Sequence, residues 1–420
     1  MNGLLGLAVR SAWNRRFTLG LTLAAIALSV CLLLAVERVR QDAREGFQQS
    51  ISGTDLVVGA RTGPVQLMLY AVFHVGGATS NIRWESLQRI AERPEVAWVI
   101  PLSLGDSHRG YPVLGTNAAY FEHLRYGQSE SLRFSVGQQF QGLFEAVLGS
   151  EVANRLGYRV GDRIVLNHGM GTAGLAEHTD KPFVVTGVLA PTGTPVDRTV
   201  HVGLEAIQAL HLDWKGGAPI PGFSIPPEYV RKFDLAPKEI TAALVGLKNR
   251  AAVFRMQRFV NDYPGEPLLG VLPGVALDEL WEIVGFVERL LLLISIMVIS
   301  VGLAGLVAVV LAGLNERRRE LAILRSVGAR PRDIFVLLLA ESFVVTLLGA
   351  IAGAVLLGVL TLVLAPAVQA HFGLAIQPRL LSLGELQWLA AVVGAALLAS
   401  VVPGYRAYRL SLSDGLVPRL

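Results

Sequence analysis

The residues best suited to a specific interaction lie between Asn315 and Phe335, where the chain reads NERRRELAILRSVGARPRDIF and holds six arginines. Guanidinium groups bind carboxylates and phosphates through charge-assisted hydrogen bonds, so a dense group of them is suited to contact another molecule. Apolar segments long enough to cross a bilayer flank this stretch on both sides. We therefore interpret it as the cytoplasmic elbow of a membrane protein.

The elbow has the sequence features of a short helix with defined ends. Gly328 is suited to end one helix, and Pro331 is suited to begin the next. Three or four arginines would be enough for a simple topological anchor, whereas the mixture of acidic, basic and apolar residues over 315–333 favours a docking helix. The residues that we predict to dock are Glu316, Arg317, Arg318, Arg319, Glu320, Leu321, Leu324, Arg325 and Gly328.

No catalytic site is visible in the sequence. A phosphate-binding P-loop requires a lysine directly after a glycine, and none of the five lysines follows one. The glycine-containing segment PTGTPVD precedes a predicted strand instead of opening a helix, so it is interpreted as a structural turn. We expect no catalytic residue and no directly bound cofactor, and any use of ATP would come from another chain.

Histidines are the remaining residues that could do chemistry, because imidazole is the commonest metal ligand. The segment HGMGTAGLAEHTD holds two of them, but its spacing fits no compact zinc motif. All eight histidines fall on the predicted outer side, but most soluble residues are expected there, so chance explains much of this distribution. We predict no metal ligands and leave zinc handling open as an alternative. The eight histidines are His74, His108, His123, His168, His178, His201, His211 and His371.

The elements that carry these residues are dominated by membrane spans. Of the 420 residues, 52% are hydrophobic and 17% are charged, which is unusual for a soluble chain. A spanning helix needs about 20 apolar residues, and four segments meet this requirement. We predict spans at 17–36, within 277–314, at 334–367 and at 386–405.

The distribution of arginines predicts the orientation, because positively charged short loops remain on the cytoplasmic side. Basic residues precede the first span, fill the elbow and follow the last span, whereas the predicted outer loop 368–385 contains only Arg379. We expect both termini in the cytoplasm, an amphipathic interfacial helix over 1–16 and a cytoplasmic tail over 406–420. The isoelectric point of about 9.3 then reflects membrane topology and gives no support to nucleic-acid binding.

Three features of the spans bear on packing. The first span is interpreted as a retained anchor in which Cys31 is a buried thiol. Glu341 lies in the third span and would either face protein and water or reach the inner interface. Gly349 and Gly353 have the four-residue spacing that allows close helix packing.

A long outer domain separates the first two spans. Residues 37–276 read as a helical stalk followed by alternating helices and strands, with helices predicted at 84–91 and 251–261 and strands at 96–102, 240–247 and 268–272. These distant units would pair into one split layer, and the segment between them reads as mostly β. The predicted fold is an α-helical membrane protein with four transmembrane helices and a large α+β extracytoplasmic domain.

The run ERRRELAILRSVGARPRDI closely resembles the signature of the FtsX/MacB/LolC permease family, the membrane subunits of type VII ABC transporters. Glu341 followed by Gly349 and Gly353 fits the same pattern. VPGYRAYRLSLSDGL is similar to the family's closing motif, although Gly404 and Ser413 depart from it. VLGSEVANRLGYRVGD and VVTGVLAPTGTPVD are similar to the family's periplasmic core, a split porter-like layer with an inserted β-rich subdomain.

The resemblance implies a non-catalytic permease subunit of the bacterial inner membrane, with a large periplasmic domain. Its elbow would be a coupling helix seated on a separate cytoplasmic P-loop ATPase, and ATP-driven movement would be transmitted to the outer domain (mechanotransmission). The implied partners are a second copy or a paralogous permease, a periplasmic adaptor or lipoprotein, and membrane lipids. The cargo would be a lipoprotein, a peptide or a small molecule. A signalling scaffold that controls a periplasmic hydrolase or binding protein, and zinc-related transport, remain alternatives.

Overall fold

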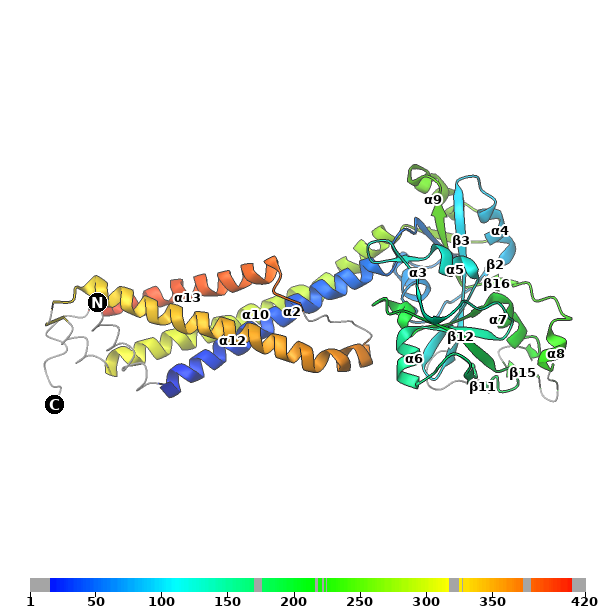
Figure 1. Cartoon of the computed structure of the whole chain (residues 1–420). Helices are drawn as coiled ribbons and strands as arrows, with labels where there is room; N and C mark the ends of the chain where they lie inside the picture. The colour runs from blue at the N-terminus through cyan, green and yellow to red at the C-terminus, as the bar shows by residue number, and fades with distance from the viewer. Residues whose placement is uncertain are drawn as a thin grey trace. The chain divides into compact units, whose positions relative to one another are not determined.

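The computed structural model of the chain divides into two compact units (Figure 1). The membrane unit comprises Met1–Asp42 and Gly285–Leu420, and the outer domain comprises Ala43–Val284. The structure describes residues 16–169, 176–215, 218–220, 223, 225–316, 325–326, 328–372 and 379–409.

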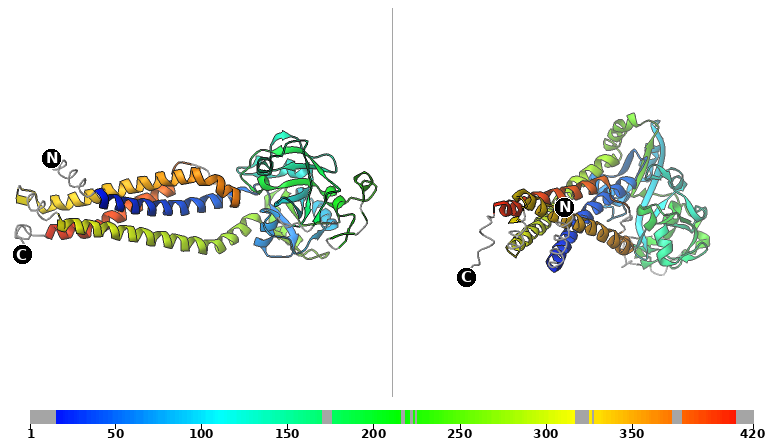
Figure 2. Two further views of the ribbon diagram at one scale, coloured as in Figure 1. Left: turned by 90° about the horizontal axis from the view of Figure 1, so that it is seen from below. Right: turned by 60° about the vertical axis from the view of Figure 1, so that its left-hand side comes forward.

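Four long helices make up the described part of the membrane unit: α2 Arg16–Gln49, α10 Pro273–Glu316, α12 Pro331–Phe372 and α13 Leu383–Arg409 (Figure 2). Each contains an apolar stretch long enough to cross a membrane. In lipid, a helix satisfies every backbone hydrogen bond within its own segment, which explains why apolar runs of this length fold as single helices. The prediction of four transmembrane helices is confirmed.

The membrane unit has a small core of its own. Large apolar side chains on the outside of the helices, such as Val301 and Leu362, remain exposed, as expected for surfaces that contact lipid. Cys31 is buried. The side chains at the centre include Ile26, Val30, Leu34, Leu306, Leu338 and Ala396.

The helices extend beyond the predicted spans. Helix α12 continues to Phe372 and α13 already begins at Leu383, so the connection between them is shorter than the predicted outer loop 368–385. Helix α10 begins at Pro273, ahead of the predicted stalk. Hydropathy locates only the apolar run, whereas capping groups determine where a helix ends. The observed helices are therefore longer than the predicted spans. The predicted interfacial helix over 1–16 lies almost entirely outside the described residues, as does most of the predicted tail.

One part of the outer-domain sheet is the split layer that the sequence predicts. Its strands lie in the order β18 Leu268–Val271, β1 Leu56–Ala60, β17 Ala242–Leu247 and β3 Val96–His108, and all three pairings are antiparallel. Val57 packs on the side of α3, Pro64–Ala71. Leu56 and Val58 pack on the opposite side, which α4 Trp84–Ala91 and α9 Val253–Asn261 cover.

Strand β3 connects the split layer to the inserted β-rich part. Its first half pairs with β17 up to Leu102, and its second half pairs with β4, Tyr111–Thr116, from Ser103 onward. The register shifts between Leu104 and Asp106, where Gly105 has a φ of +155°. Beyond β4 the sheet continues through β13 Val200–Gly203, β8 Glu145–Leu148, β12 Phe183–Leu189 and β7 Phe134–Gly137.

Short elements complete the outer domain. The helices are α5 Ala118–His123, α6 Ser150–Leu156, α7 Leu204–Leu210 and α8 Pro227–Val230, with the 3-10 turns η1 Pro195–Arg198 and η2 Arg250–Ala252. The short strands are β2 Ile82–Arg83, β5 Arg125–Tyr126, β6 Glu130–Ser131, β9 Arg163–Ile164, β10 Asn167–His168, β11 Ala176–Glu177, β14 Trp214–Lys215, β15 Ala218–Pro219 and β16 Glu239–Ile240.

The PTGTPVD segment is the structural turn that the sequence predicted. The buried carboxylate of Asp197 accepts hydrogen bonds from the Thr192 backbone N–H at 2.8 Å, the Gly193 backbone N–H at 2.8 Å and the Thr192 hydroxyl at 2.9 Å. The Asp197 carboxylate thus satisfies these donors, and the hydrogen bonds stabilise the turn.

We predict that Asp197→Ala destabilises the outer domain by about 1–3 kcal/mol, because it removes the buried acceptor of the hydrogen bonds donated by Thr192 and Gly193. The measurement is the thermal unfolding midpoint of the full chain in detergent. The control is Asp262→Ala, which removes an exposed carboxylate. Equal midpoints for the two variants would contradict the role assigned to Asp197.

Candidate functional site

The elbow lies only partly within the described residues. Arg317, Arg318, Arg319, Glu320, Leu321 and Leu324 fall outside them. Glu316 is the last residue of α10, and Arg325 is helical and half-buried. Gly328 has a φ of +107°, a left-handed conformation that glycine adopts without steric cost and that commonly ends a helix.

Helix α12 begins with a well-defined cap directly after the elbow. Pro331 is its first residue, where a missing N–H costs nothing. The Asp333 carboxylate accepts a hydrogen bond from the Arg330 backbone N–H at 2.8 Å, and the Asp333 N–H donates to the Arg330 carbonyl at 2.9 Å. The carboxylate also lies at the positive end of the helix dipole. Any force applied to the elbow would therefore act on a helix with a fixed start.

The two glycines of α12 lie against α2. A Cβ placed on Gly349 would come 2.9 Å from the Ile26 side chain, and one on Gly353 would come 2.6 Å from the Ala27 carbonyl oxygen. Only glycine allows the two backbones to approach this closely. Glu341 is half-buried about two turns before Gly349 on the same helix.

A buried ion pair joins α2 to the start of α13. Arg38 Nε donates to Glu385 Oε1 at 2.9 Å and Arg38 Nη2 donates to Glu385 Oε2 at 3.3 Å, and the two side chains are 4% and 0% exposed. Ser382 completes the arrangement: its N–H donates to Glu385 Oε2 at 2.7 Å and its hydroxyl accepts from the Glu385 N–H at 3.2 Å. The last two bonds form a capping box, so Glu385 both starts α13 and ties it to α2.

Further polar contacts continue along α2. Arg379 donates to the Gln41 side-chain oxygen at 3.0 Å and lies 3.1 Å from Asp42. Glu37 accepts from Arg40 at 2.7 Å and from Gln41 at 2.6 Å. The arginines at this end of the unit are therefore paired with carboxylates of α2 and α13, which makes the region a charged clamp between helices.

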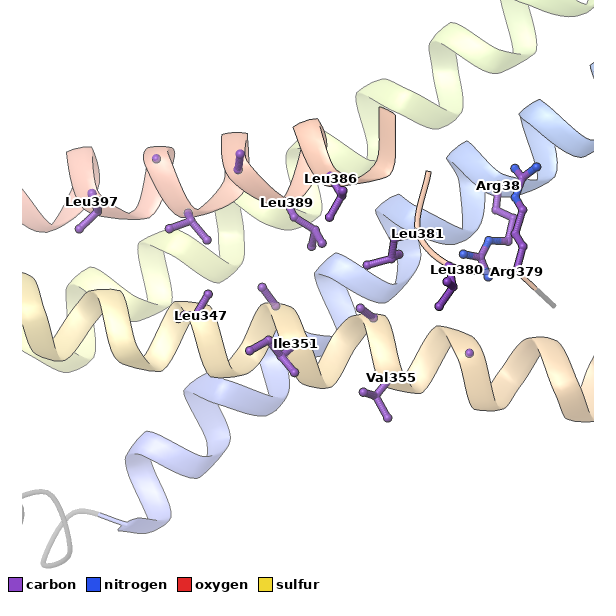
Figure 3. Close-up of a pocket in the computed structure, with 16 residues that line it drawn as sticks. Arg38, Leu347, Ile351, Val355, Arg379, Leu380, Leu381, Leu386, Leu389 and Leu397 are labelled. Carbon is purple, nitrogen blue, oxygen red and sulfur yellow. The ribbon is translucent and has the colours of Figure 1, made fainter. Parts of the chain in front are cut away.

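An apolar cavity of about 860 Å³ lies beside this clamp, between α12, α13 and the segment before α13 (Figure 3). Apart from Arg38 and Arg379, its lining consists of aliphatic side chains and glycine, including Leu347, Ile351 and Leu389. Such a surface accommodates hydrocarbon, and none of the lining residues has a group suited to bond-making chemistry.

Sequence reasoning missed Arg38 and Glu385. Both were placed outside the apolar windows, Arg38 in a stalk and Glu385 at the end of a loop. The available signal was Ser382 followed three residues later by Glu385, the spacing of a capping box. That signal would have located the start of α13, but not the partner on α2.

The fold defines a class: a membrane protein with four apolar helices and a large α+β outer domain. Two family models match it. Residues 292–412 match the FtsX-like permease C-terminal model, and residues 19–219 match the MacB-like periplasmic core domain model. The chain belongs to the ABC transporter permeases of the FtsX/MacB type.

Curated relatives agree with this assignment. The pyoverdine export ATP-binding/permease protein PvdT of Pseudomonas syringae pv. tomato is 24% identical over 360 residues, which cover 83% of this chain and 50% of the relative. The protein of the same name from Pseudomonas entomophila is 23% identical over 360 residues with the same coverage. The chain thus spans about half the length of the curated relatives that it matches.

Solved structures of two periplasmic or extracellular domains are also similar. The periplasmic region of MacB from Actinobacillus actinomycetemcomitans is 10% identical and covers 55% of this chain and 94% of its own, with a TM-score of 0.35. The extracellular domain of the transporter YknZ from Gram-positive bacteria is 12% identical and covers 52% of this chain and 98% of its own, with a TM-score of 0.30. The family assignment rests on the family models.

We predict that Glu385→Leu lowers the stability of the membrane unit by about 3–5 kcal/mol, because it leaves the buried Arg38 charge without a partner. The double variant Arg38→Leu with Glu385→Leu should recover most of the loss. The thermal midpoint in detergent reports the effect, and Arg40→Leu, which removes a 35% exposed arginine, is the control. A double variant as unstable as Glu385→Leu alone would show that the charge pairing is not the cause.

Proposed function

We propose that this chain is the membrane subunit of an ATP-driven transporter, in which a cytoplasmic ATPase does conformational work on the outer domain through the membrane helices. The family assignment supports the transporter class. The termini and the elbow are proposed to lie in the cytoplasm of a bacterial cell, and the outer domain in the periplasm, from the distribution of arginines.

One observation carries the mechanical part of the proposal. Helix α10 begins inside the core of the outer domain, where Ala276 and Leu277 are 1% and 6% exposed and cluster with Val57 and Leu244. The same helix includes the apolar stretch Gly285–Leu314 and ends at Glu316, the first predicted docking residue. At about 1.5 Å per residue, a 44-residue helix is about 66 Å long, roughly twice the hydrocarbon thickness of a bilayer. A movement at the elbow therefore has a continuous helix along which to travel.

The source of energy is proposed to be a P-loop ATPase seated on the elbow. Within these 420 residues no lysine directly follows a glycine, so the described sequence supplies no P-loop. The relatives that match over half their length are described as ATP-binding/permease proteins. We propose that the ATPase of this transporter is a separate chain, and that neither a catalytic residue nor a cofactor of this chain takes part in hydrolysis.

A second permease copy is proposed to face α10. Only 11% of the most apolar 18-residue stretch of α10 is buried in the membrane unit, whereas the value for α2 is 44%. A helix this exposed contacts lipid or another protein. Because two ATPase subunits would need two elbows, a dimer of this chain or of this chain with a paralogue fits the proposal.

The cargo is proposed to be a molecule handled outside the membrane: a small molecule, a peptide or a lipoprotein. The relatives named for pyoverdine export favour a small molecule, and the apolar cavity favours a cargo with a hydrocarbon part. Accumulation of a cargo after depletion of this chain would distinguish a transporter from a scaffold that controls an outer hydrolase.

We predict that Arg318→Glu and Leu324→Glu each reduce the ATPase that co-purifies with the chain from native membranes by at least about tenfold. The physical reason is that a like charge or a buried carboxylate on the docking surface costs several times RT. The measurement is ATP hydrolysis in the purified complex, together with the amount of the ATPase chain.

Arg406→Glu is the matched control, since Arg406 is an exposed arginine at the inner end of α13 and lies outside the predicted docking surface. It should leave assembly and hydrolysis unchanged. Wild-type assembly and hydrolysis in both elbow variants would remove the docking assignment.

A further inference from the structure

Four side chains able to bind a metal meet on the inserted β-rich part of the outer domain. They are Asp106, His168, His178 and His211, and one ligand atom from each lies within 4.8 Å of every other. Asp106 and His178 are buried, whereas the side chains of His168 and His211 are each 26% exposed. The cluster therefore sits just below the surface, with one side open to solvent.

The fold brings these residues together from four segments. Strand β10 pairs with β3 so that His168 lies directly opposite Asp106. On its other edge β10 pairs with β11, and His178 follows β11 directly, with its backbone N–H bonded to the Leu166 carbonyl at 2.9 Å. His211 is the residue that ends α7.

The ligand atoms of Asp106, His168 and His211 are spaced much as in a small tetrahedral site. His168 Nδ1 lies 3.0 Å from Asp106 Oδ1 and 3.1 Å from His211 Nε2, and His211 Nε2 lies 3.6 Å from Asp106 Oδ1. Ligands bound tetrahedrally to zinc at 2.0–2.1 Å are about 3.3 Å apart. Small outward shifts of these side chains would be enough to admit an ion.

His178 provides a second, independent observation. It is 1% exposed, and neither of its ring nitrogens has a hydrogen-bond partner among the described residues. A buried polar group without a partner is costly, and it requires an explanation such as an ion. Buried histidines elsewhere in the domain are bonded: His201 lies 3.3 Å from the Val147 carbonyl oxygen, and His108 lies 2.6 Å from that of Val165.

The orientation of His211 favours metal binding. Its Nδ1 lies 2.9 Å from the Ile207 carbonyl oxygen, and because a carbonyl only accepts, Nδ1 carries the proton and donates it. The other nitrogen, Nε2, then presents its lone pair to the cluster. This outer hydrogen bond to a backbone carbonyl is a common way in which proteins fix the tautomer of a metal-binding histidine.

Neighbouring groups hold the cluster in shape. The fully buried Lys181 ammonium donates to both oxygens of Asp213, at 2.9 and 2.7 Å, and so fastens the segment after His178 to the segment after His211. The Trp214 ring lies over His178, with ring centroids 4.4 Å apart, and near His168 at 4.9 Å. Together, the ion pair and the apolar ring therefore support all three histidines.

We propose that Asp106, His168, His178 and His211 form a binding site for a divalent transition metal ion of the zinc type. Three imidazole nitrogens and one carboxylate oxygen match the ligands that Zn²⁺ prefers, and they are poorly suited to Mg²⁺ or Ca²⁺, which prefer oxygen. The bound ion would fasten β3, β10 and the end of α7 together. The site is independent of the elbow, so its failure would leave the proposed transport function untouched.

The test uses the tag-free full chain in detergent, stripped of metal with a chelator and titrated with Zn²⁺ against a chromophoric competitor. We expect one Zn²⁺ per chain with a dissociation constant below about 1 μM. His178→Ala and His211→Ala should each weaken binding by more than about 100-fold, since even outer-shell partners of metal ligands contribute about 10–100-fold. The matched control is His123→Ala, which removes an outer-domain histidine that stacks on Trp98, away from the cluster.

A second variant keeps the proposal testable if the alanine variants fail to fold. His168→Gln changes a partly exposed ligand, and circular dichroism with size-exclusion chromatography would establish that this variant is folded. Zn²⁺ should raise the thermal midpoint of the wild-type chain and of His123→Ala, but not that of His168→Gln. Co²⁺ in place of Zn²⁺ should give the strong visible absorption of a tetrahedral site.

Binding of less than about 0.2 equivalents of Zn²⁺ at micromolar concentration would overturn the proposal. Wild-type affinity in both His178→Ala and His168→Gln would also overturn it, because the bound ion would then lie elsewhere.

Discussion

The continuity of helix α10 is the constraint on which the rest of the account depends. Its backbone bonds run without a break from Pro273, in the core of the outer domain, to Glu316 at the elbow. Lipid leaves no alternative to a fully bonded helix, so the apolar stretch Gly285–Leu314 makes all its backbone hydrogen bonds within its own segment. The capped start of α12 and the clamp between Arg38 and Glu385 then limit where the neighbouring helices are able to bend.

Much of this fold was predictable because its signals are local. Four apolar windows and their flanking arginines predict the four membrane helices, and α4 was predicted with its observed bounds, Trp84–Ala91. Strand β1 was missed. All five of its residues are buried, so the run LVVGA shows no alternation, and nothing in its local sequence reveals that it lies at the centre of the split layer.

The contacts that sequence reasoning missed are those between distant residues. Arg38 and Glu385 are 347 residues apart, and a charged residue beside an apolar window carries no sign of its partner. The histidine cluster is similar: Asp106 and His168 are 62 residues apart and become neighbours only through the pairing of β3 with β10. The prediction of no metal ligands rested on the absence of a compact motif and stays a prediction, whereas the proposed site is assembled by sheet pairing, which needs no such motif.

The two units differ in the kinds of side-chain contact that they contain. The described residues of the membrane unit provide close helix packing at Gly349 and Gly353 and a buried pair of charges between α2 and α13. The outer domain contains the groups that can recognise something, including the histidine cluster on its inserted part. We propose that movement is transmitted through the membrane unit and that recognition takes place in the outer domain.

The most direct measurement of the central claim is the ATP-dependent movement of the outer domain when α10 is interrupted. In the complex assembled with its ATPase, spin labels at Asp262→Cys would report the distance between two outer domains with and without ATP. The account predicts an ATP-dependent change in the intact chain, and its loss when four glycines are inserted between Val284 and Gly285. A change of undiminished amplitude in the insertion variant would contradict transmission through this helix.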